Sequence, residues 1–215
     1  RAYYRAGARV VAIDLSPELI TLGQEMLKRE NKSGRAVTWH VASADKIPMV
    51  RDRSVDAATI VLAIQNIENA PGVFHECARV LKPHGRLFLV MNHPAFRVPK
   101  QSDWGWDEKQ GVQYRRLDEY LSESKVKIDM HPGARKGPDL VGAHVLNQQS
   151  QYTISFHRPL QVYFKHLAKA GFAVTRLEEW ISDRQGPKGR RFAASEKARH
   201  EIPLFLFLEG KKLEL

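Results

Sequence analysis

An acidic residue near the start of the chain ends a strand-like run and leads directly into a helix-start signal. Residues 10–13 form an apolar run typical of a buried strand, and Asp14 follows them. In an α/β sheet such an acid lies outside the carboxyl edge of its strand, where a carboxylate can bind both hydroxyls of a ribose. The pattern therefore predicts a site for a nucleoside-like cofactor. Asp14 could instead cap the following helix, but Ser16 already suits that role, with Pro17 in the first turn.

Two further polar residues follow later strands. His93 follows the strand-like run 86–91 after Asn92 and could act as a base or as a substrate contact, or it could anchor the start of the next loop. Asn66 follows the apolar run 55–64 and could orient a substrate through its amide, or be an ordinary turn residue.

Residues 93–157 break the regular pattern with proline, glycine, tryptophan and charge. Segments this long in a compact domain are usually lids or binding elements, so we expect an inserted cap over the site. Trp104 and Tyr114 stand beside charged residues, an arrangement that suits contact with a flat or anionic acceptor, although Trp104 could belong to the cap's own small core. Arg115 could bind a carboxylate or phosphate, or pair with a nearby acid. His157 belongs to the returning edge of the same cap.

The elements that must position these residues alternate between strand and helix periods. This alternation predicts an α/β fold with a Rossmann-like, mostly parallel sheet and helices on both faces. A helix should follow Asn69, and another should follow Arg158 and end at Gly171. The chain should close with an antiparallel hairpin of residues 172–181 and 202–208. We expect the basic segment 184–200 between them to be a solvated loop, and favour this over a nucleic-acid patch because few aromatic residues interleave.

The start of the numbering carries a further expectation. Residues 1–7 have the pattern of a helix end closed by Gly7, so a first strand and a glycine-rich turn would lie upstream. The predicted organisation is a cofactor-binding core over residues 1–92, the cap over 93–157, and a closing helix with strands over 158–215.

Composition narrows the class of protein. The 215 residues are 43% hydrophobic, which is enough for one packed domain. The single cysteine, Cys77, lies on the apolar face of a predicted helix, which indicates a packed core thiol and, with no disulfide framework, a cytoplasmic location. No apolar run approaches the roughly 20 residues that span a bilayer. The nine histidines form no pair of metal-ligand spacing, so we expect no metal site. The net charge of +10 leaves nucleic acid as a possible but unfavoured partner.

Four features in chain order carry a family resemblance. Asp14 is followed by Ser43-Ala44-Asp45, by the loop 63–66, and by the turn R-V-L-K-P-H-G at 79–85. The series resembles the class I S-adenosylmethionine-dependent methyltransferases, especially the small-molecule and quinone-type members, over about residues 1–95 and the closing strands. The family's glycine-rich motif has no matching residues in this chain.

The resemblance implies roles for individual residues. Asp14 would hold the ribose hydroxyls of S-adenosylmethionine, Leu15 would pack on the adenine, and Asp45 would accept a hydrogen bond from the adenine amino group. Asn66 stands where relatives often carry a histidine near the methyl group. Ala44 and Lys46 would lend backbone contacts beside the adenine, and Leu62 and Ala63 would line the methionine end of the cofactor.

The sequence thus predicts methyl transfer from S-adenosylmethionine to a small organic acceptor by direct displacement. A noncatalytic RNA-binding or scaffold protein on the same fold is the main alternative, favoured by the charge and by the unmatched glycine motif. A nicotinamide-dependent reductase is a second alternative, but the chain has no Tyr-x-x-x-Lys pair. The oligomeric state is left open.

Overall fold

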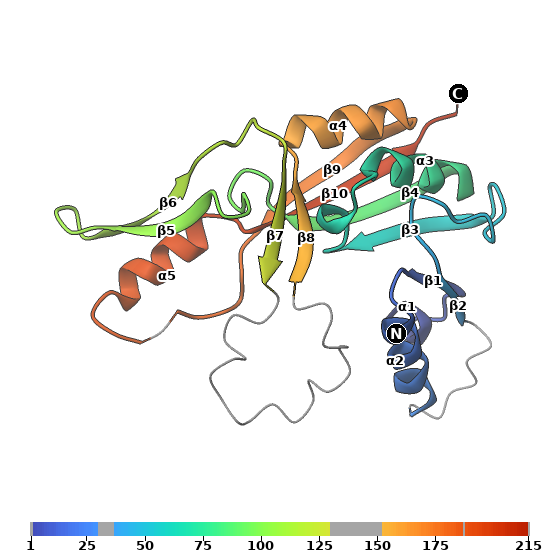
Figure 1. Ribbon diagram of the computed structural model, residues 1–215, viewed down its shortest axis with the longest axis horizontal. Helices are drawn as coiled ribbons and strands as arrows, with labels where there is room; N and C mark the ends of the chain where they lie inside the picture. Colours follow the sequence, from blue (N-terminus) through green and yellow to red (C-terminus); the bar gives the residue numbers. More distant parts are fainter. Residues whose placement is uncertain (1, 30–36, 130–151, 187, 215) are drawn as a thin grey trace.

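The computed structural model describes residues 2–29, 37–129, 152–186 and 188–214. Its elements form two hydrogen-bonded sheets flanked by helices, with two antiparallel strand pairs on one side (Figure 1). The predicted class, a mixed α/β Rossmann-like fold, is confirmed.

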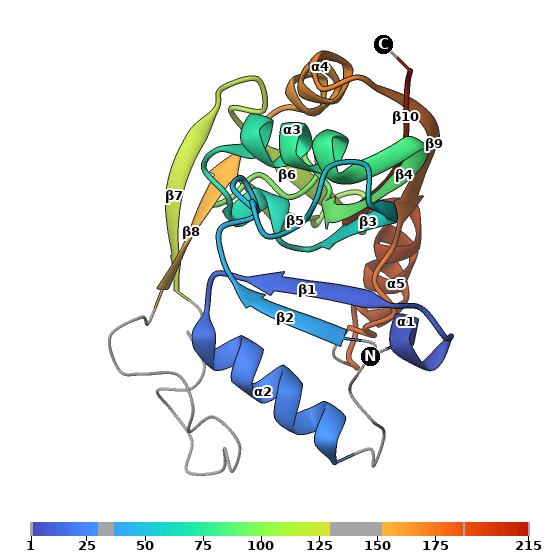
Figure 2. The ribbon, with the colours of Figure 1, turned by 90° about the vertical axis from the view of Figure 1, so that its right-hand side faces the viewer.

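The first sheet pairs β1 (Val10–Asp14) in parallel with β2 (Val37–Val41), so that the two strands end side by side, with Asp14 opposite Val41. The helix α2 (Pro17–Lys28) packs against both strands, and Figure 2 shows it on the side of this sheet away from β3. It begins where predicted, because the Ser16 hydroxyl accepts the N–H of Leu19. The short α1 (Ala2–Arg5) ends before Gly7, which takes a left-handed φ of +88°.

The second sheet has the strand order β3-β4-β10-β9. Its members are β3 (Val55–Val61), β4 (Leu81–Asn92), β9 (Phe172–Trp180) and β10 (Phe205–Lys212). β3 runs parallel to β4, whereas β10 lies between β4 and β9 and is antiparallel to both. The predicted C-terminal antiparallel pair is therefore present. Among the described residues β1 and β3 share no ladder, so the parallel strands form two separate sheets.

The core lies between the second sheet and the helices α3 (Ala70–Val80) and α4 (Leu160–Lys169), which cover the same face of it (Figure 2). Alternate β4 residues Leu87, Leu89 and Met91 point into this core, where they join Phe74 of α3 and Leu167 of α4. Each such side chain contributes about 1.5–3 kcal/mol through burial, so this layer dominates the stability of the site's scaffold.

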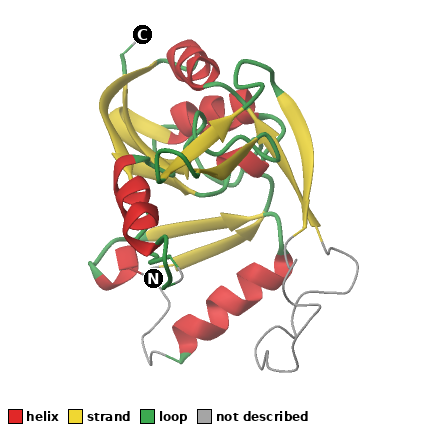
Figure 3. Cartoon of the chain, turned by 90° about the vertical axis from the view of Figure 1, so that its left-hand side faces the viewer, coloured by secondary structure: helices red, strands yellow, loops and turns green. Residues whose placement is uncertain are grey.

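The segment predicted as a cap contains two antiparallel strand pairs (Figure 3). β5 (Ser102–Asp107) pairs with β6 (Val112–Leu117), and β7 (Ser124–Asp129) pairs with β8 (Tyr152–His157). Residues 130–151 of this segment lie outside the described residues. A three-residue 3-10 helix, η2 (Ile64–Asn66), follows β3 and contacts β8.

The expectation of a solvated loop over residues 184–200 is wrong in its second half. The helix α5 (Phe192–Glu201) occupies it and packs on β6 (Figure 1). Glycines and a proline at 186–189 suggested a loop, but the alanine-rich stretch after Phe192 consists largely of good helix formers.

Candidate functional site

Asp14 lies at the carboxyl end of β1. Its Oδ1 accepts the N–H of Ser16 at 2.9 Å, which forms a tight turn before α2, while Ser16 itself caps the helix. Among the described residues, no hydrogen bond reaches Asp14 Oδ2. The next residue, Leu15, is 72% exposed and offers an apolar surface beside the carboxylate. Asp14 therefore shapes its own turn and still presents one oxygen to a ligand.

Asp45 lies in the turn after β2. The Ser43 hydroxyl donates to its Oδ1, and Asn69 Nδ2 donates to its Oδ2 at 2.8 Å. These two donors, Ser43 first, hold the pKa of Asp45 below its usual range, so the side chain is a carboxylate at neutral pH. Asn69 also caps α3 through the N–H of Gly72. One asparagine thus joins the turn after β2 to the helix after β3.

Ala44 and Lys46, the two sequence neighbours of Asp45, differ in their exposure to solvent. Ala44 packs against the core, whereas Lys46 is exposed and its backbone N–H closes the turn onto Ser43 O at 3.0 Å.

A clamp fixes the loop that follows this turn. Arg79 donates to Glu76 and to the carbonyls of Ile47 and Val50, at 2.7–2.9 Å. Glu76 in turn accepts the N–H of Ile47 at 2.7 Å. Arg79 lowers the pKa of Glu76, and Glu76, with Asp52, raises the pKa of Arg79. The sequence flagged Arg79 only as part of a turn motif, and its function as a brace for the Asp45 loop was missed.

The end of β3 carries a strained residue. Leu62 has a φ of +52°, rare for a residue with a branched side chain, and its N–H donates to Val90 O at 2.8 Å. Left-handed backbone at a non-glycine residue costs on the order of 1–3 kcal/mol and is concentrated at functional sites. Ala63 follows, half-buried, and Asn66 is exposed at the end of η2.

His93 is 3% exposed and both of its ring nitrogens have partners. Nδ1 accepts the backbone N–H of Ala95 at 3.2 Å, so Nε2 carries the proton and donates to Glu179 Oε1 at 2.8 Å. This geometry supports the alternative that His93 anchors the loop after β4.

Three of the predicted substrate contacts lie together on the β5–β6 hairpin. Arg115 donates to Phe96 O at 2.8 Å and to Ser102 Oγ at 2.9 Å, and its guanidinium lies 5.2 Å from the Trp104 ring. Burial lowers the pKa of Arg115. Tyr114 is exposed on the same hairpin. Arg115 therefore braces the hairpin and lies over the ring of Trp104, which is half-buried.

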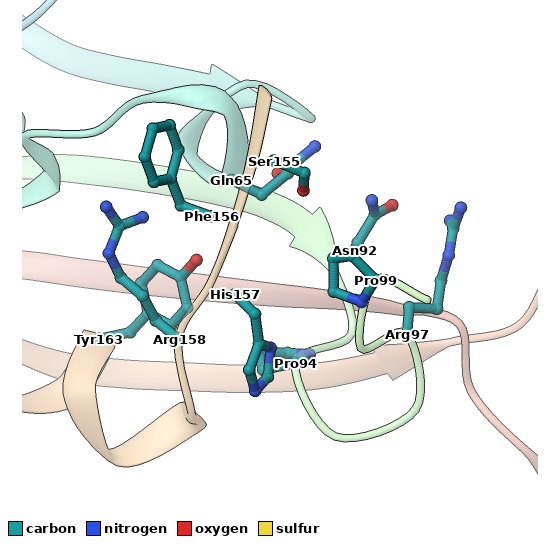
Figure 4. Close-up of a pocket in the computed structure, with 10 residues that line it drawn as sticks. All are labelled: Gln65, Asn92, Pro94, Arg97, Pro99, Ser155, Phe156, His157, Arg158 and Tyr163. Carbon is teal, nitrogen blue, oxygen red and sulfur yellow. The ribbon is translucent and has the colours of Figure 1, made fainter. Parts of the chain in front are cut away.

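A small hollow of about 20 Å³, with room for about one water molecule, lies where η2, the end of β4, β8 and α4 meet (Figure 4). His157, the fourth predicted substrate contact, lines it. Its Nε2 donates to Tyr120 O at 2.8 Å, and because a carbonyl can only accept, Nδ1 carries the lone pair. The hollow is lined by Gln65, Asn92, Pro94, Arg97, Pro99, Ser155, Phe156, His157, Arg158 and Tyr163.

The sequence analysis did not single out several of these lining residues for a functional role. Arg158 and Tyr163 were interpreted only as the start and the apolar stripe of α4, and Arg97 was not singled out. Burial raises the pKa of Tyr163 and lowers that of Arg97. For Arg158, the sequence signal is its position directly before a helix, at the end of the predicted cap.

The described residues hold neither a metal-ligand cluster nor a membrane-spanning helix. No three of their histidine, cysteine, aspartate or glutamate side chains gather as a metal site would require. No helix in the same residues is both long and apolar enough to span a membrane.

Comparison with protein families gives a match over residues 1–89 to the methyltransferase domain. Among curated proteins, the demethylmenaquinone methyltransferase of Tropheryma whipplei (strain Twist) is 36% identical over 95 residues, which is 44% of this chain and 37% of the relative. The ubiquinone/menaquinone biosynthesis C-methyltransferase of Geobacter sp. (strain M21) is 39% identical over 85 residues, which is 40% of this chain and 35% of the relative. The chain thus spans little more than a third of the length of these relatives.

Solved structures extend the likeness to nearly the whole chain. An S-adenosylmethionine-dependent methyltransferase from Mesorhizobium loti matches 95% of this chain and 81% of its own with a TM-score of 0.66 at 22% identity. The glycopeptide N-methyltransferase MtfA, complexed with S-adenosylmethionine, matches 99% of this chain and 80% of its own with a TM-score of 0.57 at 13% identity. The sequence likeness to methyltransferases thus covers residues 1–89, and the solved structures show that nearly the whole chain shares the fold of S-adenosylmethionine-dependent methyltransferases.

Proposed function

We propose that the protein transfers a methyl group from S-adenosylmethionine to a small organic acceptor by direct displacement. The observation that carries the proposal is the carboxylate of Asp14 at the end of a parallel strand, with one oxygen unoccupied, beside the ionised Asp45 turn. Curated relatives named for demethylmenaquinone and ubiquinone biosynthesis support a quinone-type acceptor. The single cysteine, which forms no disulfide, supports a cytoplasmic location.

The residues present fit the cofactor. Asp14 Oδ2 would accept from the ribose hydroxyls, and the exposed Leu15 side chain would pack on the adenine. Asp45 would accept from the adenine amino group, with backbone contacts from Ala44 and Lys46. Leu62 and Ala63 would line the methionine end. When bound, S-adenosylmethionine supplies a methyl group on an already activated leaving group.

Toward the acceptor, the protein therefore needs mainly to position the accepting atom in line with the methyl group. Correct positioning alone can supply about 7–11 kcal/mol of a barrier, and a base is needed only if the acceptor must lose a proton. His157, whose Nδ1 holds a lone pair, meets the requirement for such a base better than His93, whose nitrogens are both engaged. Asn66, exposed at the end of η2, would orient the acceptor.

Calorimetry with S-adenosylhomocysteine tests the proposal. We expect residues 1–215, or the same chain extended upstream, to bind this product, and Asp14→Asn to weaken binding by about 10–100-fold, because hydrogen bonds to charged groups contribute about 1.5–3 kcal/mol. Asp118→Asn is the matched control, since Asp118 pairs with Arg116 on the β5–β6 side and should leave affinity unchanged.

Two results would contradict the proposal. Binding by neither chain would refute it and leave a noncatalytic protein on this fold. Equal affinity of the Asp14→Asn and parent chains would refute the role given to Asp14.

A further inference from the structure

A second and larger hollow lies at the edge of the second sheet where β3, β4 and β9 begin and β10 ends. Its volume is about 300 Å³, at the small end of ligand sites, which suits a molecule of about one ring. β3 has seven residues, so this edge lies about 20 Å from the carboxyl end of the same strand, where Leu62 follows it. The hollow is therefore distinct from the site proposed for S-adenosylmethionine. We call it the basic hollow, and its walls include Arg53, Pro83, Gly171, Lys212, Leu213 and Glu214.

Hydrogen bonds fix the walls of the basic hollow. The N–H of Arg53 donates to Arg79 O at 2.9 Å, and the N–H of Leu213 donates to Gly171 O at 2.8 Å. Lys212 Nζ donates to Leu81 O at 2.7 Å, which uses one of its three N–H donors. The backbone that carries both cationic residues is thus held in place, and Lys212 keeps two donors for a ligand.

The two cationic side chains of the basic hollow repel each other. Burial first, and then the charge of Arg53, lower the pKa of Lys212, and Asp52 offsets this only in part. Among the described residues, no hydrogen bond or ion pair engages the side chain of Arg53. An anion between Arg53 and Lys212 would replace this repulsion by two attractions.

The acidic side chains near the basic hollow have partners of their own. Asp52 pairs with Arg79 at 2.5 Å, and Glu214, which lines the hollow, lies 3.3 Å from His84 Nε2. Neither acid is therefore committed to Arg53 or Lys212, and the positive charge of these two residues is available to a ligand.

We propose that the basic hollow binds a small phosphate monoester, with the phosphate between Arg53 and Lys212 and the organic group against Leu213 and Pro83. A phosphate monoester carries a charge of about −1.5 to −2 at pH 7, which matches two cations, and guanidinium and ammonium groups are both suited to bind it. Leu213 is 46% exposed, so apolar surface stands beside the charged groups. This inference does not depend on the proposed function, because none of these residues has a part in the methyl transfer.

The test is a titration of the full chain, followed by NMR in phosphate-free buffer of low salt, with phenyl phosphate, inorganic phosphate and phenol. We expect phenyl phosphate to bind and to shift the amide signals of Gly171 and Leu213, whereas phenol, which lacks the charge, should not bind. Phenyl phosphate that shows no saturable binding up to about 10 mM would overturn the inference.

Arg53→Gln tests the charge of the site. It should weaken phenyl phosphate binding about tenfold or more, because hydrogen bonds to charged groups are among the stronger ones. Lys211→Gln is the matched control, since it removes the same charge next to Lys212 but on the opposite face of the strand, and it should bind as the parent does. Equal effects of the two substitutions would show only a diffuse attraction of anions to a basic chain and would overturn the site.

Leu213→Ala tests the apolar half of the site and leaves both cations in place. It should weaken the binding of phenyl phosphate and leave that of inorganic phosphate unchanged, because inorganic phosphate has no organic group to pack on Leu213. An equal effect on both ligands would overturn the assignment of the organic group to this wall.

Discussion

Replacing Glu76 by glutamine removes the charge at the centre of the clamp that braces the Asp45 loop. Glu76 accepts hydrogen bonds from Arg79 at 2.7 and 2.9 Å and from the N–H of Ile47 at 2.7 Å. Glutamine keeps the shape of the glutamate side chain and one acceptor oxygen, but its amide N–H groups would face a donor, either Arg79 or the N–H of Ile47. The side chains of Glu76 and Arg79 are 18% and 28% exposed, so the pair lies between the surface and buried limits.

The surface and buried limits set the expected loss of folding free energy. Exposed ion pairs contribute about 0–1 kcal/mol, and breaking a buried pair costs about 3–5 kcal/mol. We therefore expect Glu76→Gln to lower the free energy of unfolding at pH 7 by about 1–2 kcal/mol, measured by urea denaturation. For a domain of this size the melting temperature should fall by about 2–8 °C.

The dependence on pH provides the sharper assay. Arg79 depresses the pKa of Glu76 in the folded chain, so the carboxylate stabilises the fold fully above its unfolded pKa of about 4.3 and loses that effect as the pH falls through the lower folded pKa. The difference between parent and variant should thus be full at pH 7 and should shrink as the pH drops below about 4. Asp56→Asn is the control, since Asp56 pairs with Lys82 on the exposed surface and should cause little change. A difference that stays constant down to about pH 2.5 would refute the reasoning.

Two further predictions concern the neighbouring turn and helix. Gly85→Ala should lower the free energy of unfolding by about 1–3 kcal/mol in urea titrations, because the new Cβ would lie 2.9 Å from Lys82 O. Gly189→Ala is the control and should be nearly neutral, since no atom lies within 4 Å of its Cβ position. Equal effects of the two substitutions would contradict this packing. Cys77 should resist a thiol reagent at pH 8 until urea is added, since burial raises the pKa of its thiol to about 12, and rapid labelling of the folded chain would contradict its place in the core.

The sequence alone determined the elements whose signals are local. The caps Ser16 and Asn69 begin α2 and α3 where predicted, because a side chain reaching an N–H three residues ahead needs no distant partner. The apolar stripe of α4 and the glycine after it likewise located that helix. The resemblance carried by the turn at 79–85 also rests on short, contiguous motifs, and the methyltransferase-domain match over residues 1–89 agrees with it.

Only the tertiary structure decided which of these elements meet. The insertion of β10 between β4 and β9, and the division of the parallel strands into two sheets, depend on pairings across many residues that no local pattern encodes. The different surroundings of His93 and His157 were likewise decided by contacts that are distant in the sequence. His93 turns toward Glu179 and His157 lines the hollow, because the side of each strand end that faces the core is set by its neighbours in space. The hydrogen bonds from Arg158 to the carbonyls of Ile67 and Glu68 likewise join segments about 90 residues apart, so they could be recognised only after folding.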